Sequence, residues 1–169
     1  LNITRPDAIM DIHRSYLNVG AEIVETNSFG STPLVLSEYG LAEESRIINR
    51  TAAEIARKAV EEFTTGTSPR FVAGSIGPTT KSISVTGGIS WDELADNFYV
   101  QAAGLMEGGA DFLLVETSQD ILNVKAALDG IDRLSDELGW EIDVAVQCTI
   151  EAMGTTLGGQ DIEAFYTSL

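Results

Sequence analysis

The sequence predicts an α/β fold built on a parallel sheet, and two features of its pattern predict it. Short apolar runs of strand length alternate with longer amphipathic stretches of helix length. Most of the apolar runs are followed by a polar or glycine-rich turn before the next helix begins. Connections that contain a helix cross over from one strand to the next, so the strands are expected to run parallel. The expected strands are 23–26, 71–75, 112–115 and 143–150.

The first expected element is a helix that begins near Thr4 and ends at Gly20. Thr4 offers a hydroxyl cap, Pro6 suits the first helical turn, and Asp7 adds an early acid. The residues expected to share one face of this helix are Ile9, Ile12, Tyr16 and Val19.

A second helix is expected from about Glu43 to Phe63. Its predicted buried stripe consists of Ile48, Ala52, Ile55, Ala59 and Phe63. After the second strand comes a loop with several glycines, and loops of that length usually carry function. Ser90 and Glu93 form a predicted capping box that begins a third helix, which ends near Met106.

The last predicted helices are 119–138, which ends at Gly139, and a helix that begins near Asp161. The chain starts with Leu1 rather than methionine and stops within this last helix. We therefore expect residues 1–169 to be one partial domain, truncated at both ends, of a longer protein.

The spacing of the strands favours a (β/α)8 TIM barrel with enlarged loops, whose full length is typically about 250 residues. With four visible strands, about half of such a barrel is expected. The competing fold is a doubly wound open sheet, which needs a glycine-rich phosphate turn after its first strand. The segment 25–30 supplies no such turn.

Charge and cysteine content limit the classes of function. The chain carries 26 acidic and 10 basic residues, for a net charge of -16. Nucleic acid and anionic membrane surfaces would repel it, so neither is expected as a partner. A single cysteine cannot form an internal disulfide and fits a reducing compartment, so a cytoplasmic location is expected.

A phrase of Gly-Ala, an acid, an apolar run and Glu-Thr occurs at 20–26 and again at 109–117. It places Glu25 and Glu116 at the carboxyl ends of parallel strands, where ligands bind in such folds. By the alternation of side chains, Ile23, Glu25 and Asn27 share one face of the first strand. A carboxylate that is partly removed from water needs a cation or several donors, and a substrate ammonium would serve. Hydrogen bonds from neighbouring loop backbone are the structural alternative.

The same alternation separates two sets of residues in the fourth strand. Cys148 shares its face with Val144 and Val146 and is expected to pack against helices, as a small hydrophobic residue. Gln147 and Thr149 take the opposite face and are expected at the mouth of the barrel. With His13 placed on a helix far from the mouth, no zinc cluster can be assembled from these residues.

Several segments resemble the homocysteine S-methyltransferase family, and in particular the homocysteine-binding domain of its cobalamin-dependent branch, methionine synthase. The resemblance covers essentially the whole chain, in the expected order. The segments that carry it are Leu1–Asp7, Gly20–Phe29, Val72–Thr79, Val115–Thr117 and Thr156–Tyr166.

The resemblance implies a (β/α)8 barrel in which zinc, held by three cysteines, binds the thiolate of homocysteine. Zinc coordination deprotonates a thiol that is otherwise mostly protonated at neutral pH. The thiolate takes a methyl group from methylcobalamin to give methionine, and methyltetrahydrofolate remethylates the cobalamin. Cobalamin and folate domains of the same chain are therefore implied partners.

By resemblance, Glu116 binds the ammonium group of homocysteine. The full expected set of substrate-binding residues is Glu116, Glu25, Asn27, Ser75, Gly77, Thr117, Gln147 and Thr149. The family's cysteine motifs, Asn-Cys and Gly-Gly-Cys-Cys-Gly, do not occur in the chain. The zinc ligands are therefore expected outside it, no catalytic or metal-binding residue is expected within it, and the four strands become strands two to five.

Two alternatives remain open from the sequence. The methyl donor could be betaine or S-methylmethionine instead of methylcobalamin. The barrel could also be a non-catalytic amino-acid-binding domain that has lost its metal.

Overall fold

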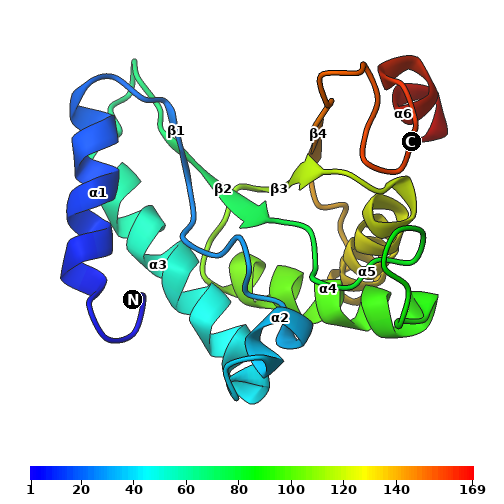
Figure 1. The fold of residues 1–169 in the computed structure, drawn as a ribbon. Coiled ribbons are helices and arrows are strands. Elements are labelled where there is room, and N and C mark those ends of the chain that lie inside the picture. Colours follow the sequence, from blue (N-terminus) through cyan, green and yellow to red (C-terminus); the bar gives the residue numbers. More distant parts are fainter.

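The computed structural model describes residues 1–169, and its elements alternate between helix and strand (Figure 1). In chain order they are α1 (Pro6–Asn18), β1 (Ile23–Glu25), α2 (Pro33–Ser37), the 3-10 helix η1 (Ala42–Glu44), α3 (Ser45–Phe63), β2 (Phe71–Ile76), α4 (Trp91–Glu107), β3 (Phe112–Ser118), α5 (Ile121–Leu138), β4 (Val144–Cys148) and α6 (Ile162–Ser168). No helix combines the length and apolar character needed to cross a bilayer.

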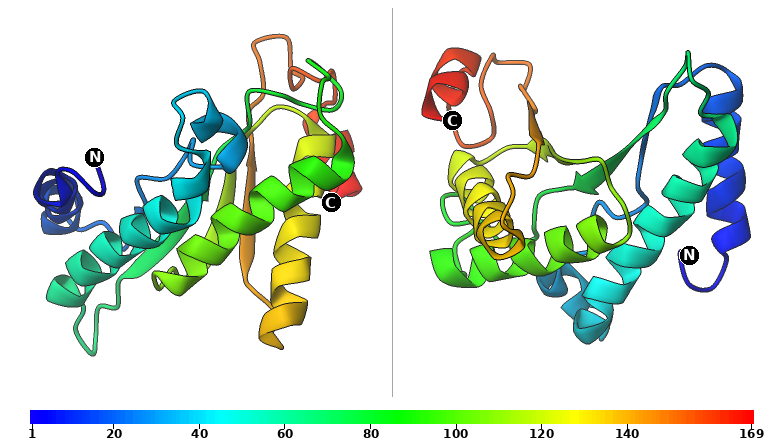
Figure 2. Two further views of the ribbon diagram at one scale, coloured as in Figure 1. Left: turned by 90° about the horizontal axis from the view of Figure 1, so that it is seen from below. Right: turned by 180° about the vertical axis from the view of Figure 1, so that it is seen from behind.

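The four strands form one sheet in the order β1-β2-β3-β4, and every neighbouring pair is parallel. Helices α1, α3, α4 and α5 lie together on one side of this sheet, while its other side carries no helix (Figures 1 and 2). The predicted α/β fold with parallel strands and helical crossovers is confirmed.

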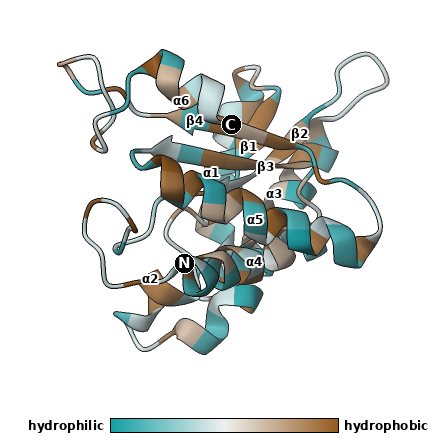
Figure 3. Ribbon diagram, turned by 90° about the vertical axis from the view of Figure 1, so that its right-hand side faces the viewer, coloured by the Kyte–Doolittle hydropathy of each residue, from teal (hydrophilic) through white to brown (hydrophobic).

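The core lies between the sheet and the helices. Strand residues Val72, Ile76, Leu113 and Val115 point into it and are at most 4% exposed. Figure 3 shows hydrophobic colour along the strands and hydrophilic colour on much of the outer surface of the helices. Burying this apolar surface is the main source of stability of the fold.

Glycines allow the helices to pack closely on one another. A Cβ atom on Gly104 in α4 would lie 2.5 Å from the carbonyl oxygen of Arg46 in α3. A Cβ atom on Gly130 in α5 would lie 2.5 Å from the carbonyl oxygen of Ala95 in α4. Any larger residue at either position would push two helices apart.

The start of α1 corrects one prediction. Thr4 does not cap the helix; Arg5 occupies the N-cap position and makes no side-chain hydrogen bond there. Pro6 takes the first helical position, as expected.

The buried face of α1 also differs from the predicted one. Ile9 is buried, but Ile12, Tyr16 and Val19 are exposed, and the buried stripe is Ile9, His13 and Leu17. The helix packs on α3 through this four-residue spacing. Ile12 and Tyr16 instead lie with strand residues around a cavity on the helix-free side of the sheet.

The other elements follow the prediction with small shifts of their ends, but Ile48 and Phe63 of the predicted α3 stripe are only half-buried. The capping box of Ser90 and Glu93 is present in α4, and Gly139 ends α5 in the left-handed conformation, with φ of 76°. The five-residue helix α2 was not predicted, and β3 continues past the predicted end at Val115 to Ser118. Strand β4 stops at Cys148, before the predicted end at Ile150.

The helix-free side of the sheet exposes apolar side chains. Ile23 in β1 is 50% exposed, and Phe71 in β2 is 42% exposed. These residues share the side-chain parity of Glu25, so this face leads directly to the carboxylates at the strand ends.

Candidate functional site

Two carboxylates lie at or near the carboxyl ends of two strands. Glu25 ends β1, and Glu116 lies near the end of β3, two strands away in the sheet. Partial burial raises the pKa of Glu25 above its ordinary value, and the negative charge of Glu116 raises this pKa further. The sequence prediction that these two residues face one region is consistent with this electrostatic coupling.

No basic side chain neutralises this pair. None of the seven ion pairs of the chain involves Glu25 or Glu116. Two nearby carboxylates without a basic partner create a negative potential that attracts a small cation.

Glu116 is held by two hydroxyl groups. Ser75 Oγ donates a hydrogen bond to Glu116 Oε1 at 2.5 Å, and Thr117 Oγ1 donates to Glu116 Oε2 at 3.4 Å. The two carboxylate oxygens therefore each have a donor, the second a weak one. A carboxylate oxygen accepts more than one hydrogen bond, so capacity remains for a ligand.

Side chains from the end of β1 fix the backbone of Ser75. Its N–H donates to Thr26 Oγ1 at 2.9 Å, and its carbonyl oxygen accepts from Ser28 Oγ at 2.7 Å. The hydroxyl groups of Thr26 and Ser28 lie 2.6 Å apart. Because the Ser28 proton is donated to Ser75, the Thr26 hydroxyl donates to Ser28.

Helix α4 joins this network through Gln101. Its Nε2 donates to the carbonyl oxygen of Ser28 at 2.7 Å, and the side chain is completely buried. Sequence reasoning missed Thr26, Ser28 and Gln101. Gln101 had a signal, a polar residue within the otherwise apolar stretch 100–106, which must find hydrogen-bond partners when buried. Thr26 and Ser28 lie in a polar stretch and gave no such signal.

The backbone changes direction directly after Glu116. Thr117 has φ of 54° and is the one non-glycine residue with a positive φ. The register between β3 and β4 shifts here, from Val115 opposite Val146 to Ser118 opposite Cys148. Three steps along β3 thus match two steps along β4, which is the geometry of a β-bulge.

The remaining predicted residues lie around this centre without bonding to the carboxylates. Gly77 donates its N–H to the carbonyl oxygen of Phe29 at 3.0 Å, and a Cβ atom on it would lie 2.6 Å from the Phe29 ring. Asn27 Nδ2 donates to Asn2 Oδ1 at 2.9 Å. Thr149 donates its N–H to the carbonyl oxygen of Ser118 at 2.9 Å, and Gln147 is exposed to solvent.

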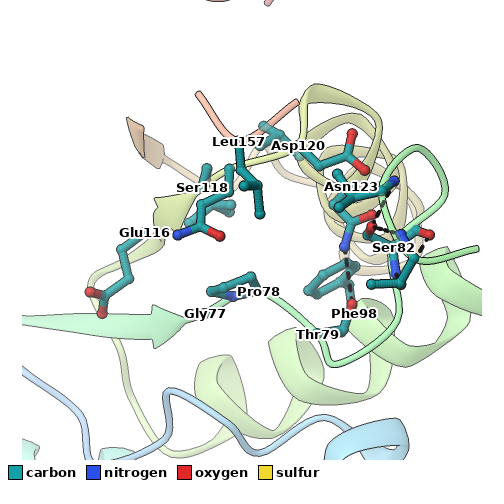
Figure 4. A pocket seen from close by; sticks show the side chains of 15 residues that line it. Gly77, Pro78, Thr79, Ser82, Phe98, Glu116, Ser118, Asp120, Asn123 and Leu157 are labelled. Atoms are coloured by element: carbon teal, nitrogen blue, oxygen red, sulfur yellow. Dashed lines mark hydrogen bonds between the residues drawn. The ribbon is translucent and has the colours of Figure 1, made fainter. Parts of the chain in front are cut away.

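A pocket extends from Glu116 towards the start of α5 (Figure 4). Gly77 and Pro78 form part of its wall, and Asp120 and Asn123 lie at its far end. Asp120 Oδ2 accepts from Ser84 N at 3.0 Å, and Asn123 Oδ1 accepts from Ile83 N at 3.2 Å. These two side chains fasten the glycine-containing loop after β2 to α5.

The residues of the chain do not fit a zinc site. No group of three His, Cys, Asp or Glu side chains could hold a metal ion. Cys148 packs against the hydrophobic core on the helix side, as its parity predicted. His13 is buried in α1, and its Nε2 has no hydrogen-bond partner.

Solved structures with the same fold include the homocysteine methyltransferase MmuM from Escherichia coli. Its metallated form matches with a TM-score of 0.81 and 22% identity, over 98% of this chain and 59% of that one. Its oxidised form matches with a TM-score of 0.77 and 23% identity, over 95% and 57% of the two chains. The likeness confirms that the fold is part of a (β/α)8 barrel.

Sequence similarity extends over the whole chain. The methionine synthase of Mycobacterium leprae (strain TN) is 42% identical over 164 residues, which are 97% of this chain and 14% of that protein. This chain thus spans a small part of that relative's length. The family model for homocysteine S-methyltransferase matches residues 1–169, so the chain belongs to the homocysteine S-methyltransferase family.

Proposed function

We propose that this chain is part of the homocysteine-binding barrel domain of a methionine synthase, and that the rim with Glu25 and Glu116 binds the ammonium group of homocysteine. The observation that carries the proposal is the Glu116 carboxylate near the end of β3, which Ser75 orients by a hydrogen bond and which takes part in none of the seven ion pairs. The 42% identity to a methionine synthase supports the same branch of the family.

The chemistry of the rim suits a zwitterionic amino acid. An ammonium group donates up to three hydrogen bonds and would offset the negative charge that raises the pKa of Glu25. Hydrogen bonds between charged partners are shorter and stronger than neutral ones. Glu116 is the principal contact in this proposal because Ser75 already orients its carboxylate.

The other predicted residues complete the proposed binding surface. Gly77 lines the pocket beside Glu116, and because it has no side chain the Phe29 ring can pack against it. Asn27, Ser75, Thr117, Gln147 and Thr149 are proposed to surround the amino acid on the strand-end side. By their positions they would limit the size of the substrate and exclude water from its charged end.

The proposed reaction is methyl transfer to the sulfur of homocysteine, which gives methionine. The full-length protein is proposed to use zinc, methylcobalamin and methyltetrahydrofolate, in the cytoplasm, with cobalamin and folate domains in the same chain. The residues of this chain offer no zinc ligand set, so their proposed task is to bind and orient the amino acid. By themselves they are proposed to be inactive in methyl transfer.

Isothermal titration of homocysteine into the full-length protein tests the proposal. We expect Glu116→Gln to weaken binding by about 10-fold or more, because a hydrogen bond to a charged group contributes roughly 1.5–3 kcal/mol. Cys148→Ser is the matched control on the neighbouring strand, and we expect it to leave the affinity nearly unchanged. Equal affinities for the two variants would refute the site.

A further inference from the structure

Thr117 adopts a backbone conformation that its side chain disfavours. Its φ of 54° lies in the left-handed region, where glycine and asparagine are common and β-branched residues are rare. Such a conformation costs free energy and persists only where the surrounding structure enforces it. This strained residue lies directly beside Glu116 in β3, so a change in its conformation would move that carboxylate.

The positive φ of Thr117 coincides with the β-bulge, which changes the direction of the side chains that follow. Val115 and Ser118 are both buried on the helix side, although three steps along the strand separate them. In a regular strand, residues three apart point to opposite faces. The extra residue at Thr117 returns the chain to the helix side while Glu116 stays directed towards the strand-end rim.

The side chain of Thr117 acts on the same carboxylate. Its Oγ1 donates to Glu116 Oε2 at 3.4 Å, opposite the 2.5 Å bond from Ser75 Oγ to Oε1. Glu116 is thus restrained by the short hydrogen bond from Ser75, by a weaker one from Thr117 and by the bulge at its own backbone. A carboxylate held in one orientation loses less conformational freedom when a ligand binds.

We propose that Thr117 is a positioning residue, which holds the Glu116 carboxylate in the orientation that meets the substrate ammonium. The inference rests on the proposed function, and it changes the expected role of Thr117 from contacting the substrate to acting through Glu116. Glycine adopts a positive φ without strain but has no hydroxyl group, so Thr117→Gly should keep the bulge and lose the hydrogen bond to Glu116.

The test uses the full-length protein with Thr117→Gly, Thr117→Ser and Glu116→Gln. For Thr117→Gly we expect the KM for homocysteine to rise about fivefold, with kcat at saturating homocysteine changed less than about twofold, because only preorganisation of binding is lost. The midpoint of thermal unfolding should stay the same or rise, since glycine relieves the backbone strain. Thr117→Ser keeps the hydroxyl group and should restore a KM within about twofold of the native value.

The outcomes separate this inference from the proposed function. If Glu116→Gln raises KM and Thr117→Gly does not, the positioning role is wrong and the proposed function stands. If neither variant raises KM, the assignment of Glu116 to the substrate ammonium fails as well. Should Thr117→Gly not fold, Thr117→Asn serves in its place, because asparagine also tolerates positive φ without a branched Cβ.

Discussion

The two copies of the Gly-Ala-acid motif end in glutamates with different surroundings. Glu116 accepts hydrogen bonds from Ser75 and Thr117 and is followed by a bulge. Glu25 ends a three-residue strand, makes no side-chain hydrogen bond and is more exposed to solvent than Glu116, although it is partly shielded from water. A shared sequence phrase therefore specifies the position of a carboxylate at the rim, while its neighbours determine how firmly the carboxylate is held.

The largest expected effect is the difference between the two glutamates themselves. In the full-length protein we expect Glu116→Gln to weaken homocysteine binding by about 10-fold or more, and Glu25→Gln by about threefold, because an exposed, less restrained charge contributes less. Titration calorimetry measures both variants under one condition of salt and pH. A larger loss for Glu25→Gln would reverse the proposed order of the two residues.

The next effect tests whether the hydroxyl groups make Glu116 different. We expect Ser75→Ala to weaken homocysteine binding about fivefold and to lower the free energy of unfolding by about 1–3 kcal/mol, since the charged carboxylate loses its shortest hydrogen bond. Urea denaturation and calorimetry on the full-length protein measure the two quantities. Ser15→Ala removes an exposed hydroxyl that bonds to the Asp11 carbonyl and is the matched control. If both variants bind homocysteine equally well, Ser75 does not orient Glu116.

The sequence predicted those parts of the molecule that depend on local periodicity. The strands, the capping box at Ser90 and the outward direction of Cys148 follow from spacings of two or about 3.6 residues. The two glutamates were predicted from the same alternation of side chains, although β3 ends at Ser118 and β4 at Cys148 rather than at the predicted Val115 and Ile150.

The interactions that hold Glu116 could not be predicted in this way. The hydrogen bond from Ser28 to Ser75 spans 47 residues, and the one from Gln101 to Ser28 spans 73. Such contacts depend on how strands and helices meet, which no local pattern encodes. The bulge at Thr117 runs against local preference, so propensity gave no signal for it. The prediction of the buried face of α1 was wrong because packing on α3 buries His13 and Leu17 and leaves Ile12 and Tyr16 exposed.

The smallest expected effect concerns the proton on Glu25. Its pKa lies above the ordinary value of 4.5 because of burial and the charge of Glu116, so the folded protein holds a proton here more tightly than the unfolded chain. The free energy of unfolding therefore falls as pH rises from 4.5 through the raised pKa, because Glu25 loses its proton in this range. A bound ammonium favours the charged carboxylate, so homocysteine should release a fraction of one proton in this same window.

Calorimetry in buffers of different ionisation enthalpy detects that release in the full-length protein. The slope of the apparent binding enthalpy against buffer ionisation enthalpy should show proton release for the native protein and less release for Glu25→Gln. The same release in both would mean that Glu25 does not sense the ligand. Glu116 would then be the one carboxylate of the pair that binds the ammonium group. Glu25 would contribute only to the negative electrostatic potential around it.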